Sequence, residues 1–155
     1  SASVNTPDVI AGLAEAMQER GIKPELEVFD IGMMHYAHYL IGKGYLQPPY
    51  LFNIILGNPA TAQATPLHLG AILGEMPDDA LWAVGGIGRH QTSALALGLA
   101  SGGGVRVGLE DNLWFDQARE IPASNASLLR RALGIASALE RRPMTPAELR
   151  SALGI

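Results

Sequence analysis

The chain contains 155 residues and carries a formal net charge of −4, with acidic and basic residues mixed along its length. Apolar residues make up 48% of the sequence and charged residues 17%, a balance that supports a buried core and argues against disorder. The absence of cysteine excludes disulfides, thiolate nucleophiles and cysteine-based metal sites. The sequence has no basic stripe typical of a nucleic-acid partner and no apolar run long enough to cross a membrane, so we expect a cytoplasmic protein.

Apolar runs separated by many of the 18 glycines and 10 prolines predict alternating helices and strands. Thr6-Pro7 is a helix-start signal, and apolar residues then recur at helical spacing until Gly21. Thr65-Pro66 repeats this signal, and the segment 145–148 forms a capping box before a last short helix. The predicted strands cover residues 25–29, 50–56, 81–84 and 105–109. The longer predicted helices cover about 7–20, 32–43, 65–75, 91–100 and 124–140.

The order of these elements is α-βα-βα-βα-βα, which favours parallel strands joined by right-handed crossovers. The strands begin roughly 25–30 residues apart, and a whole (β/α)8 barrel of roughly 250 residues averages about 31 residues per unit. We therefore predict a single α/β domain over residues 1–155, with four parallel strands alternating with helices as half of a barrel. A doubly wound open sheet is the alternative, but its usual glycine-rich fingerprint is missing from the first turn, Phe29-Asp30-Ile31-Gly32.

The sharpest chemical feature is the acidic doublet Glu110-Asp111, which follows directly after the last predicted strand. In a barrel the carboxyl ends of the strands form the active-site face. Neighbouring residues at a strand end point in different directions, so one carboxylate could bind a metal while the other reaches a substrate proton. Arg106 alternates with Gly108 and Glu110, so these three should share a face, where an arginine needs an anionic partner such as a substrate carboxylate. A strand-end turn with an Asp-Asn helix cap is the alternative.

Two further segments are candidates for contacts with a substrate. Gly85-Gly86-Ile87-Gly88-Arg89-His90 follows the third predicted strand, where glycines let backbone N–H groups approach an anion and Arg89 adds positive charge. A purely structural tight turn would have the same pattern. Glu27 lies in the middle of the first predicted strand, and a carboxylate inside a barrel is costly unless it is paired or metal-bound. An inward-facing Glu27 is therefore a candidate site residue, and Asn53 on the next strand is a weaker one.

Several stretches of the chain resemble the β-keto acid cleavage enzymes, a family that includes the 3-keto-5-aminohexanoate cleavage enzyme. The resemblance runs from about Asn5 to the C-terminus, and its last motif is the most specific. The matching stretches are Asn5-Thr6-Pro7, Lys23-Pro24-Glu25-Leu26-Glu27-Val28-Phe29-Asp30, Gly86-Ile87-Gly88-Arg89-His90-Gln91 and Val105-Arg106-Val107-Gly108-Leu109-Glu110-Asp111-Asn112. The resemblance implies the C-terminal half of a (β/α)8 TIM barrel, with one divalent metal that is usually zinc (Zn2+) and with the N-terminal half absent from this chain.

The reaction that the resemblance implies is a Claisen-type exchange, in which a β-keto acid and acetyl-CoA give acetoacetate and a new acyl-CoA. By the family pattern, Glu110 would ligate the metal, and Asp111 would be the base that deprotonates the keto acid beside its carbonyl. Arg106 would position or polarise the reacting groups, and Glu27 would line the pocket. The loop residues Gly88-Arg89 would lie near the substrate or CoA.

The sequence departs from the family at the metal site, because the other two metal ligands form a His-x-His pair and this chain has no His-x-His. We therefore expect the chain to supply part of the active site and to be inactive in isolation. Family members tend to form homo-oligomers, often tetramers, and the open edges of a half barrel also favour association. The alternative function is a non-catalytic α/β small-molecule binding module or a partner subunit. We expect no nucleic-acid or membrane partner.

Overall fold

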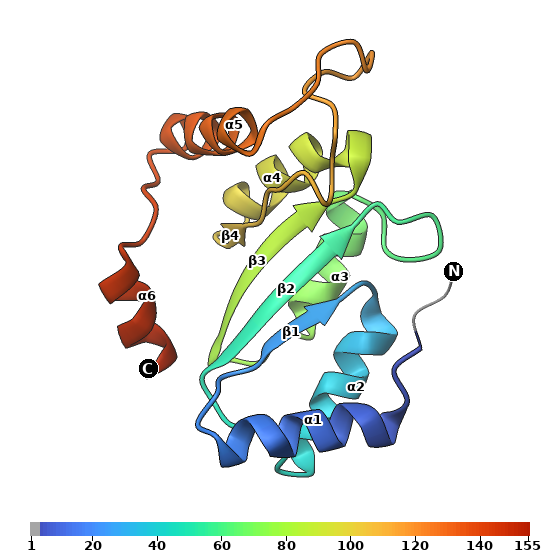
Figure 1. Cartoon of the computed structure of the whole chain (residues 1–155), viewed down its shortest axis with the longest axis vertical. Coiled ribbons are helices and arrows are strands. Elements are labelled where there is room, and N and C mark those ends of the chain that lie inside the picture. Colours follow the sequence, from blue (N-terminus) through green and yellow to red (C-terminus); the bar gives the residue numbers. More distant parts are fainter. Residues whose placement is uncertain (1–3) are drawn as a thin grey trace.

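The computed structural model describes residues 4–155 and shows, within them, four parallel strands that alternate with helices. The strand order is β1-β2-β3-β4, so each crossover joins neighbouring strands (Figure 1). The strands are β1 (Glu25–Val28), β2 (Tyr50–Leu56), β3 (Ala80–Gly86) and β4 (Gly104–Val105). The helices are α1 (Pro7–Glu19), α2 (Ile31–Gly42), α3 (Pro66–Gly74), α4 (Gln91–Ala100), α5 (Asn125–Ala138) and α6 (Pro146–Leu153), with a short 3-10 helix η1 (Gly88–His90). The predicted order of elements is confirmed.

Side-chain caps decide where the helices begin. The Thr6 hydroxyl accepts a hydrogen bond from the N–H of Val9 at 3.4 Å, and the Thr65 hydroxyl accepts one from the N–H of His68 at 3.3 Å. Both caps satisfy N–H groups that have no partner inside the helix, as the two Thr-Pro signals predict. Helix α2 begins one residue earlier than predicted, because the Asp30 carboxylate caps it by accepting from a backbone N–H 3.0 Å away.

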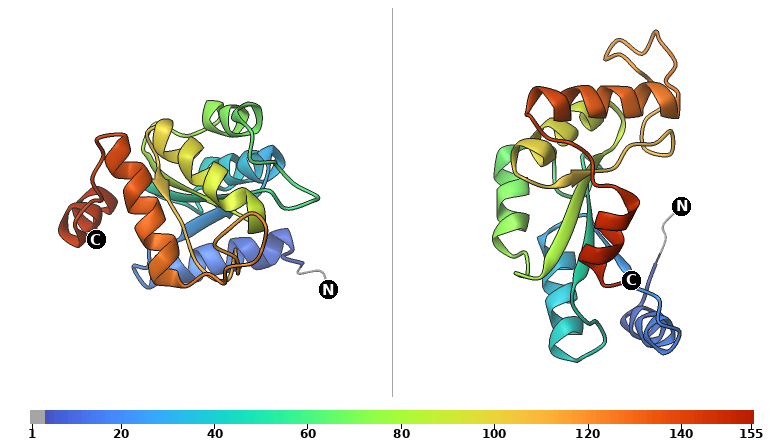
Figure 2. Two further views of the ribbon diagram at one scale, coloured as in Figure 1. Left: turned by 90° about the horizontal axis from the view of Figure 1, so that it is seen from above. Right: turned by 90° about the vertical axis from the view of Figure 1, so that its left-hand side faces the viewer.

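The hydrophobic core lies between the sheet and the helices α2, α3 and α4, of which α2 and α3 are seen on one side of the strands in the right-hand view of Figure 2. Alternate residues of each strand point into this core, and the helices contribute apolar residues from their facing sides. The buried members are Val28, Met34, Ala37, Phe52, Ile54, Leu56, Leu69, Ile72, Val84 and Ala94. The residues between them in the strands, including Glu27, Asn53 and Ala83, face the opposite side, which we call the inner face.

The fourth strand is shorter than the predicted span of 105–109, which is therefore wrong in length. After β4 one further rung continues the ladder, because the N–H of Arg106 donates to the carbonyl of Val84 at 2.9 Å. The chain then turns: the N–H groups of Asp111 and Asn112 both donate to the carbonyl of Gly108 at 3.2 Å. The acidic doublet thus sits in a tight turn at the carboxyl end of β4 rather than on an extended strand.

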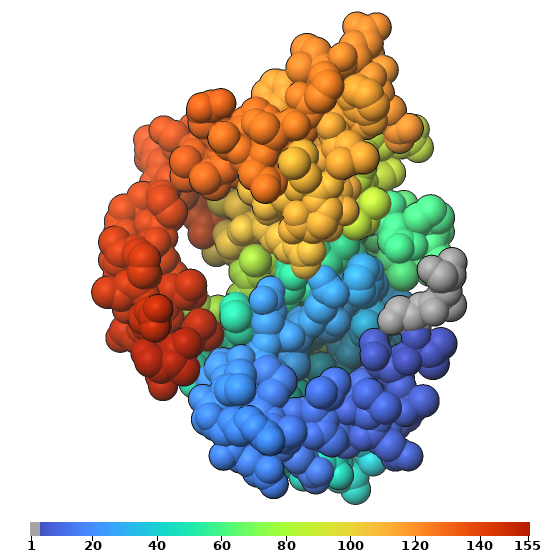
Figure 3. Space-filling view, in the orientation of Figure 1, coloured from blue at the N-terminus to red at the C-terminus, as the bar shows by residue number. Residues whose placement is uncertain are grey.

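The C-terminal segment runs along one side of the sheet, where Figure 3 shows it (red) arching beside an opening. Arg141 anchors the start of this segment at the end of α4. Its guanidinium donates hydrogen bonds to the carbonyls of Leu99 at 2.6 Å, Gly103 at 2.7 Å and Gly102 at 2.9 Å. These carbonyls belong to the last turn of α4 and the bend that follows, where a cation also interacts favourably with the helix dipole.

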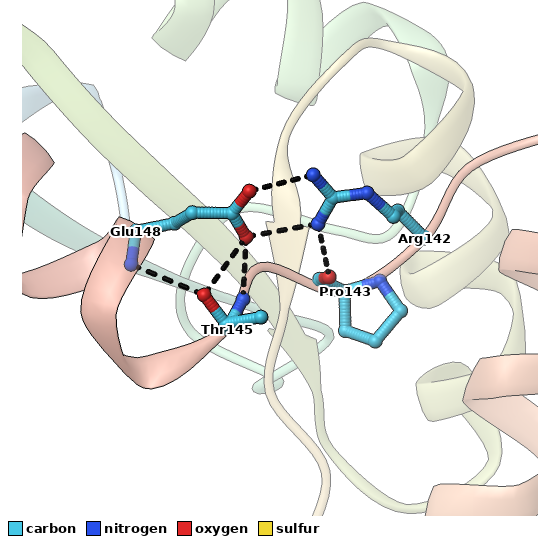
Figure 4. A network of polar contacts seen from close by, with 4 residues as sticks. All are labelled: Arg142, Pro143, Thr145 and Glu148. Atoms are coloured by element: carbon cyan, nitrogen blue, oxygen red, sulfur yellow. Dashed lines mark hydrogen bonds and ion pairs between the residues drawn. The ribbon is translucent and has the colours of Figure 1, made fainter.

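A second polar network fixes the first turn of α6 (Figure 4). The Glu148 carboxylate accepts two hydrogen bonds from Arg142, at 2.8 and 2.6 Å, and one from the N–H of Thr145 at 2.7 Å. The Thr145 hydroxyl in turn accepts from the N–H of Glu148 at 3.2 Å, which completes the predicted capping box. The hydrogen bonds from Arg142, followed by those from Thr145, lower the pKa of Glu148 from 4.5 to about 2.

This shift predicts how α6 responds to acid. Because the pKa of Glu148 is lower in the folded chain than in an unfolded one, the network stabilises α6 above about pH 4.5 and loses this effect as the pH falls toward 2. The intrinsic rate of amide hydrogen exchange also changes with pH, so the quantity to compare is the protection factor, which is the intrinsic rate divided by the observed rate. We expect the protection factors of α6 to fall over that window in the wild-type chain. In Glu148→Gln they should already be lower at pH 7 and stay nearly constant over the same window. An unchanged exchange rate at pH 7 in the variant would show that the network does not hold α6.

Candidate active site

Four charged side chains meet on the inner face, at the carboxyl ends of the strands. Arg106 Nη1 donates to Glu27 Oε1 at 2.7 Å, although the two residues lie 79 positions apart in the sequence. Arg106 Nε lies 3.2 Å from Asp111 Oδ2, and Arg106 Nη2 lies 3.7 Å from Glu110 Oε1. One guanidinium therefore contacts three carboxylates, which come from β1 and from the turn after β4. We call these residues the Arg106 cluster: Glu27, Arg106, Glu110 and Asp111.

The inner face leaves room for Arg106 to reach Glu27 across the sheet. Strands β2 and β3 separate the strand of Glu27 from that of Arg106, and β3 carries the small residues Ala83 and Gly85 on this side. A Cβ atom on Gly85 would lie 3.5 Å from the Cβ of Arg106 and only 3.0 Å from the Cδ1 of Ile55. A larger residue at position 85 would therefore crowd the path of the arginine. Glu27 lies on the inner face, the orientation that makes it a candidate site residue, while its neighbours in β1 point toward the helices.

Asp111 is the buried member of the acidic doublet, with only 6% of its side chain exposed. Burial raises the pKa of the Asp111 carboxyl; the positive charge of Arg106 opposes this rise, whereas the negative charges of Glu110 and Glu27 add to it. Its Oδ2 atom has an ion-pair partner in Arg106 but no hydrogen-bond partner among the described residues. A buried carboxylate with a raised pKa and an unused acceptor atom is suited to take up a proton.

Glu110 is the exposed member of the doublet, with 58% of its side chain open to solvent. Its carboxylate folds back over Gly108, where a Cβ atom would lie 2.0 Å from Glu110 Oε2. Arg106, Gly108 and Glu110 therefore lie together, but a turn brings them together and not the predicted alternation along a strand, because β4 ends at Val105. The need for glycine at position 108 was not predicted from the sequence, since it depends on where the Glu110 side chain lies.

Two buried amide side chains hold the turn that carries the doublet. Gln91, at the start of α4, donates to the carbonyl of Gly108 at 3.4 Å and accepts from the Asn112 side chain at 3.4 Å. Asn112 also donates to the carbonyl of Trp114 at 2.8 Å and accepts from the Trp114 N–H at 3.1 Å. Asn112 thus closes a local turn and does not cap a helix, because α5 begins later and is capped by Ser124. The proposed Asp-Asn helix cap is not observed.

The inner face also contains a buried amide oxygen without a donor. Asn53 is only 2% exposed, and its Oδ1 atom makes no hydrogen bond within residues 4–155. Asn53 is the register partner of Glu27 on one side and of Ala83 on the other. Together with Asp111 Oδ2 it gives the inner face two buried acceptors that lack donors, an arrangement that usually has a functional explanation.

The glycine-rich loop after β3 is joined to the doublet through the backbone. The N–H of Gly88, which has a positive φ of 54°, donates to the carbonyl of Asp111 at 2.7 Å. The side chain of Arg89, however, is exposed and forms no ion pair with the Arg106 cluster. It lines a separate crevice together with Arg119 and Arg131. Of the two predicted loop residues, Gly88 therefore contacts the doublet and Arg89 lies beside it.

Residues 4–155, which the structure describes, do not form a metal site by themselves. A catalytic zinc ion requires three protein ligands in addition to water or substrate. Within residues 4–155 no group of three or more His, Cys, Asp or Glu side chains is arranged to hold a metal ion. The exposed carboxylate of Glu110 fits a single ligand, held only loosely by Arg106 at 3.7 Å.

A sequence model of the beta-keto acid cleavage enzyme family matches residues 1–155. The chain belongs to this family. It is 39% identical over 152 residues to the 3-keto-5-aminohexanoate cleavage enzyme of Fusobacterium nucleatum, covering 98% of this chain and 55% of that protein. It is 33% identical over 155 residues to the 3-oxoadipate:acetyl-CoA acetyltransferase of Cupriavidus necator, covering 97% of this chain and 54% of that protein. The family member described here thus spans about half the length of these relatives.

Solved structures show the same fold. The complex of ObcA with oxaloacetate superposes with a TM-score of 0.74 at 21% sequence identity, covering 97% of this chain and 41% of that one. The apo form of ObcA gives the same TM-score at 19% identity. The prediction of the C-terminal half of a (β/α)8 barrel is confirmed, with four parallel strands alternating with helices. Among residues 4–155, no helix of this β-keto acid cleavage family member could span a membrane.

Proposed function

We propose that the chain carries the catalytic base and the active-site arginine of a β-keto acid cleavage enzyme. The enzyme would condense a β-keto acid with acetyl-CoA to give acetoacetate and a new acyl-CoA. The observation that supports this proposal is the Arg106 cluster, in which a buried Asp111 with a raised pKa lies 3.2 Å from Arg106 at the carboxyl ends of barrel strands. Several relatives are named as acetyl-CoA transferases, which supports acetyl-CoA as the second substrate.

In the proposed reaction Asp111 removes a proton from the carbon between the keto group and the carboxylate, and the resulting carbanion attacks the thioester carbonyl of acetyl-CoA and displaces the CoA thiolate. The thiolate then attacks the original keto carbonyl, and the bond between that carbonyl and the acetylated carbon breaks. The new acyl-CoA is released, and the acetoacetate carbanion takes the proton back from Asp111. Its raised pKa favours this step, because a base is most effective when its pKa lies near the working pH. Arg106 holds Asp111 and Glu27 in place and offers its remaining N–H groups to the carboxylate of the keto acid. Glu27 lines the pocket and keeps the guanidinium turned inward.

A divalent metal, zinc in our proposal, would polarise the keto oxygen and so stabilise the negative charge that follows proton removal. Glu110 would be one of its ligands, since its carboxylate is exposed and only loosely paired. Residues 4–155 contain no complete group of metal ligands. The other ligands would therefore come from outside these residues.

The rest of the barrel would complete this site. Strand β1 lies at the edge of the sheet, and an open groove of about 730 Å³ runs beside it, with apolar residues of α1 and α2 on its walls. The lining residues include Ile10, Leu13, Met17, Leu26, Met33 and Leu40. An unpaired strand edge beside apolar walls favours the addition of another strand. The term completed barrel is used below for one protein: this chain joined to the part of the Fusobacterium nucleatum relative that the chain does not match.

The test is turnover of the completed barrel with acetyl-CoA and a panel of β-keto acids, with the 155-residue chain alone as the control. The panel follows the names of the relatives and contains 3-keto-5-aminohexanoate, 3-dehydrocarnitine, 3-oxoadipate and 3,5-dioxohexanoate. We expect acetoacetate from at least one of them, dependent on both acetyl-CoA and metal, and no turnover by the chain alone. Turnover without acetyl-CoA, or none with any keto acid, would reject the proposal.

We also propose that the completed enzyme is a homo-oligomer. Helix α5 exposes Leu129 at 51% and Leu133 at 41%, and the loop before it exposes Leu113 at 64% and Ile121 at 55%. Exposed apolar side chains that lie close together are a usual sign of a protein interface.

A further inference from the structure

A crevice with three arginines lies next to the Arg106 cluster, between η1, the loop that follows β4 and helix α5. Its volume is about 10 Å³, enough for about one water molecule, and it opens to solvent. Arg89 comes from η1, Arg119 from the loop after β4, and Arg131 from α5. The one carboxylate in its lining, Asp116, is turned into its own loop and accepts hydrogen bonds from the N–H groups of Glu120 and Ile121. The lining therefore carries a formal charge of +2.

The three arginines differ in what they contact. Arg131 supports the crevice: it donates to the Thr92 hydroxyl at 2.9 Å and to the Phe115 carbonyl, and its guanidinium stacks 3.7 Å from the centre of the Phe115 ring. Arg89 and Arg119 are exposed and take part in no ion pair among the described residues. Two cationic residues that line the same crevice therefore have no anionic partner within residues 4–155.

The loop that carries Arg119 is held in a defined shape. Its two sides are bridged by hydrogen bonds from the N–H of Phe115 to the carbonyl of Ile121 at 2.8 Å and from the N–H of Ala123 to the carbonyl of Leu113 at 2.9 Å. The Gln117 side chain donates to the carbonyl of Arg89 at 2.9 Å and so joins this loop to η1. The crevice is thus organised before any ligand binds, which lowers the entropic cost of binding.

We propose that Arg89 and Arg119 bind the phosphate groups of the nucleotide end of the acyl-CoA substrate. This inference rests on the proposed function, since it names the place of a substrate that the reaction requires. In (β/α)8 barrels the loops after the last two strands frequently bind phosphate, and here those loops form the crevice. Guanidinium groups bind phosphate oxygens in pairs and match their geometry better than other cations do.

The position of the crevice also suits a long substrate. The N–H of Gly88, in the lining of the crevice, donates to the carbonyl of Asp111, so the crevice and the proposed base share a direct backbone contact. A nucleotide held outside the loops would leave the flexible pantetheine arm free to enter the barrel and bring its thioester to Asp111. Residues in the crevice would then contribute to the binding of CoA without touching the reacting atoms.

Direct binding gives the first test and requires no catalysis. Calorimetry with CoA and with adenosine 3′,5′-bisphosphate is performed on the completed barrel and on the 155-residue chain. We expect Arg89→Gln and Arg119→Gln each to weaken binding of both probes at least tenfold, and added salt to weaken wild-type binding. Arg119→Gly gives a variant that folds without strain, because Arg119 has a positive φ of 62° that glycine adopts readily. Arg130→Gln, on the exposed surface of α5, is the matched control.

The second test compares acetyl-CoA with acetyl-pantetheine, which lacks the nucleotide. We expect Arg89→Gln and Arg119→Gln to raise the KM for acetyl-CoA at least tenfold and to leave kcat and the KM for acetyl-pantetheine unchanged. The inference would be overturned if the wild type, these variants and the Arg130→Gln control bound CoA equally and had equal KM values for acetyl-CoA. The proposed function would still stand in that case, provided that all of them form acetoacetate. A wild type that binds CoA but forms no acetoacetate would instead contradict the proposed function and leave the nucleotide site standing.

Discussion

Asp111→Asn in the completed barrel will keep its fold and its metal but lose about a thousandfold in kcat, the usual contribution of a general base. The amide has nearly the same shape as the carboxyl group and can occupy the same place beside Arg106, but it cannot take up a proton. The side chain is only 6% exposed, so water is poorly placed to act in its stead. The loss is measured as kcat in steady-state assays and as the rate of product formation in single-turnover assays. Circular dichroism checks that the variant is folded.

Glu110→Gln is the matched variant, because it makes the same chemical change at the neighbouring residue. We expect it to lower the metal content of the completed barrel, measured by elemental analysis, and to lose turnover for that reason. Excess zinc in the assay should restore part of the activity of Glu110→Gln and none of that of Asp111→Asn. Near-normal rates in both variants would reject the roles assigned to the doublet.

Gly86→Ala will destabilise the chain by about 3 kcal/mol, at the upper end of the usual cost of overpacking. Gly86 ends β3 and faces the first turn of α4. A Cβ atom there would lie 2.8 Å from the Cβ of Ala94, 2.8 Å from the carbonyl oxygen of His90 and 2.9 Å from the Cα of Gln91. Two of these three atoms belong to the backbone, so a side-chain rotation cannot relieve the clash, and α4 must move away from the sheet.

The free energy of unfolding, measured by urea denaturation, tests this prediction. Gly70→Ala is the control, because Gly70 lies in α3 with no atom within 4 Å of its added Cβ. Alanine is the better helix former, so Gly70→Ala should stabilise the chain by about 0.5–1 kcal/mol. If Gly86→Ala were as stable as the wild type, the close packing of β3 against α4 would be wrong.

Local signals in the sequence predicted the elements well. The Thr-Pro pairs at Thr6 and Thr65 mark helix starts that need no tertiary context, because the cap and its N–H donor lie within three residues of each other. Strand alternation also placed Glu27 on the side opposite its two neighbours, although the sequence left open whether that side faces the barrel interior. The length of β4 did not follow from its composition, because the apolar run at 105–109 reads as a strand although Gly108 already accepts the hydrogen bonds of a turn.

The contacts of the site were harder to predict, because they join distant positions. The pairing of Glu27 with Arg106 depends on how the strands are ordered and on the small residues of β3 between them. The arginine crevice was missed for the same reason: Arg89, Arg119 and Arg131 belong to three separate elements, and no short motif contains them. Only the resemblance to the family assigned roles to Glu110 and Asp111, and these roles stay predictions.

The two charged regions at the strand ends have opposite signs. The Arg106 cluster pairs one guanidinium with three carboxylates, whereas the crevice sets three guanidinium groups against one carboxylate. A molecule with several negative charges at one end and an uncharged group at the other experiences a torque in such a field, because its charged end is drawn outward and repelled from the interior. An approaching thioester would therefore arrive already turned with its acyl end toward the barrel, and dissolved salt would weaken this alignment.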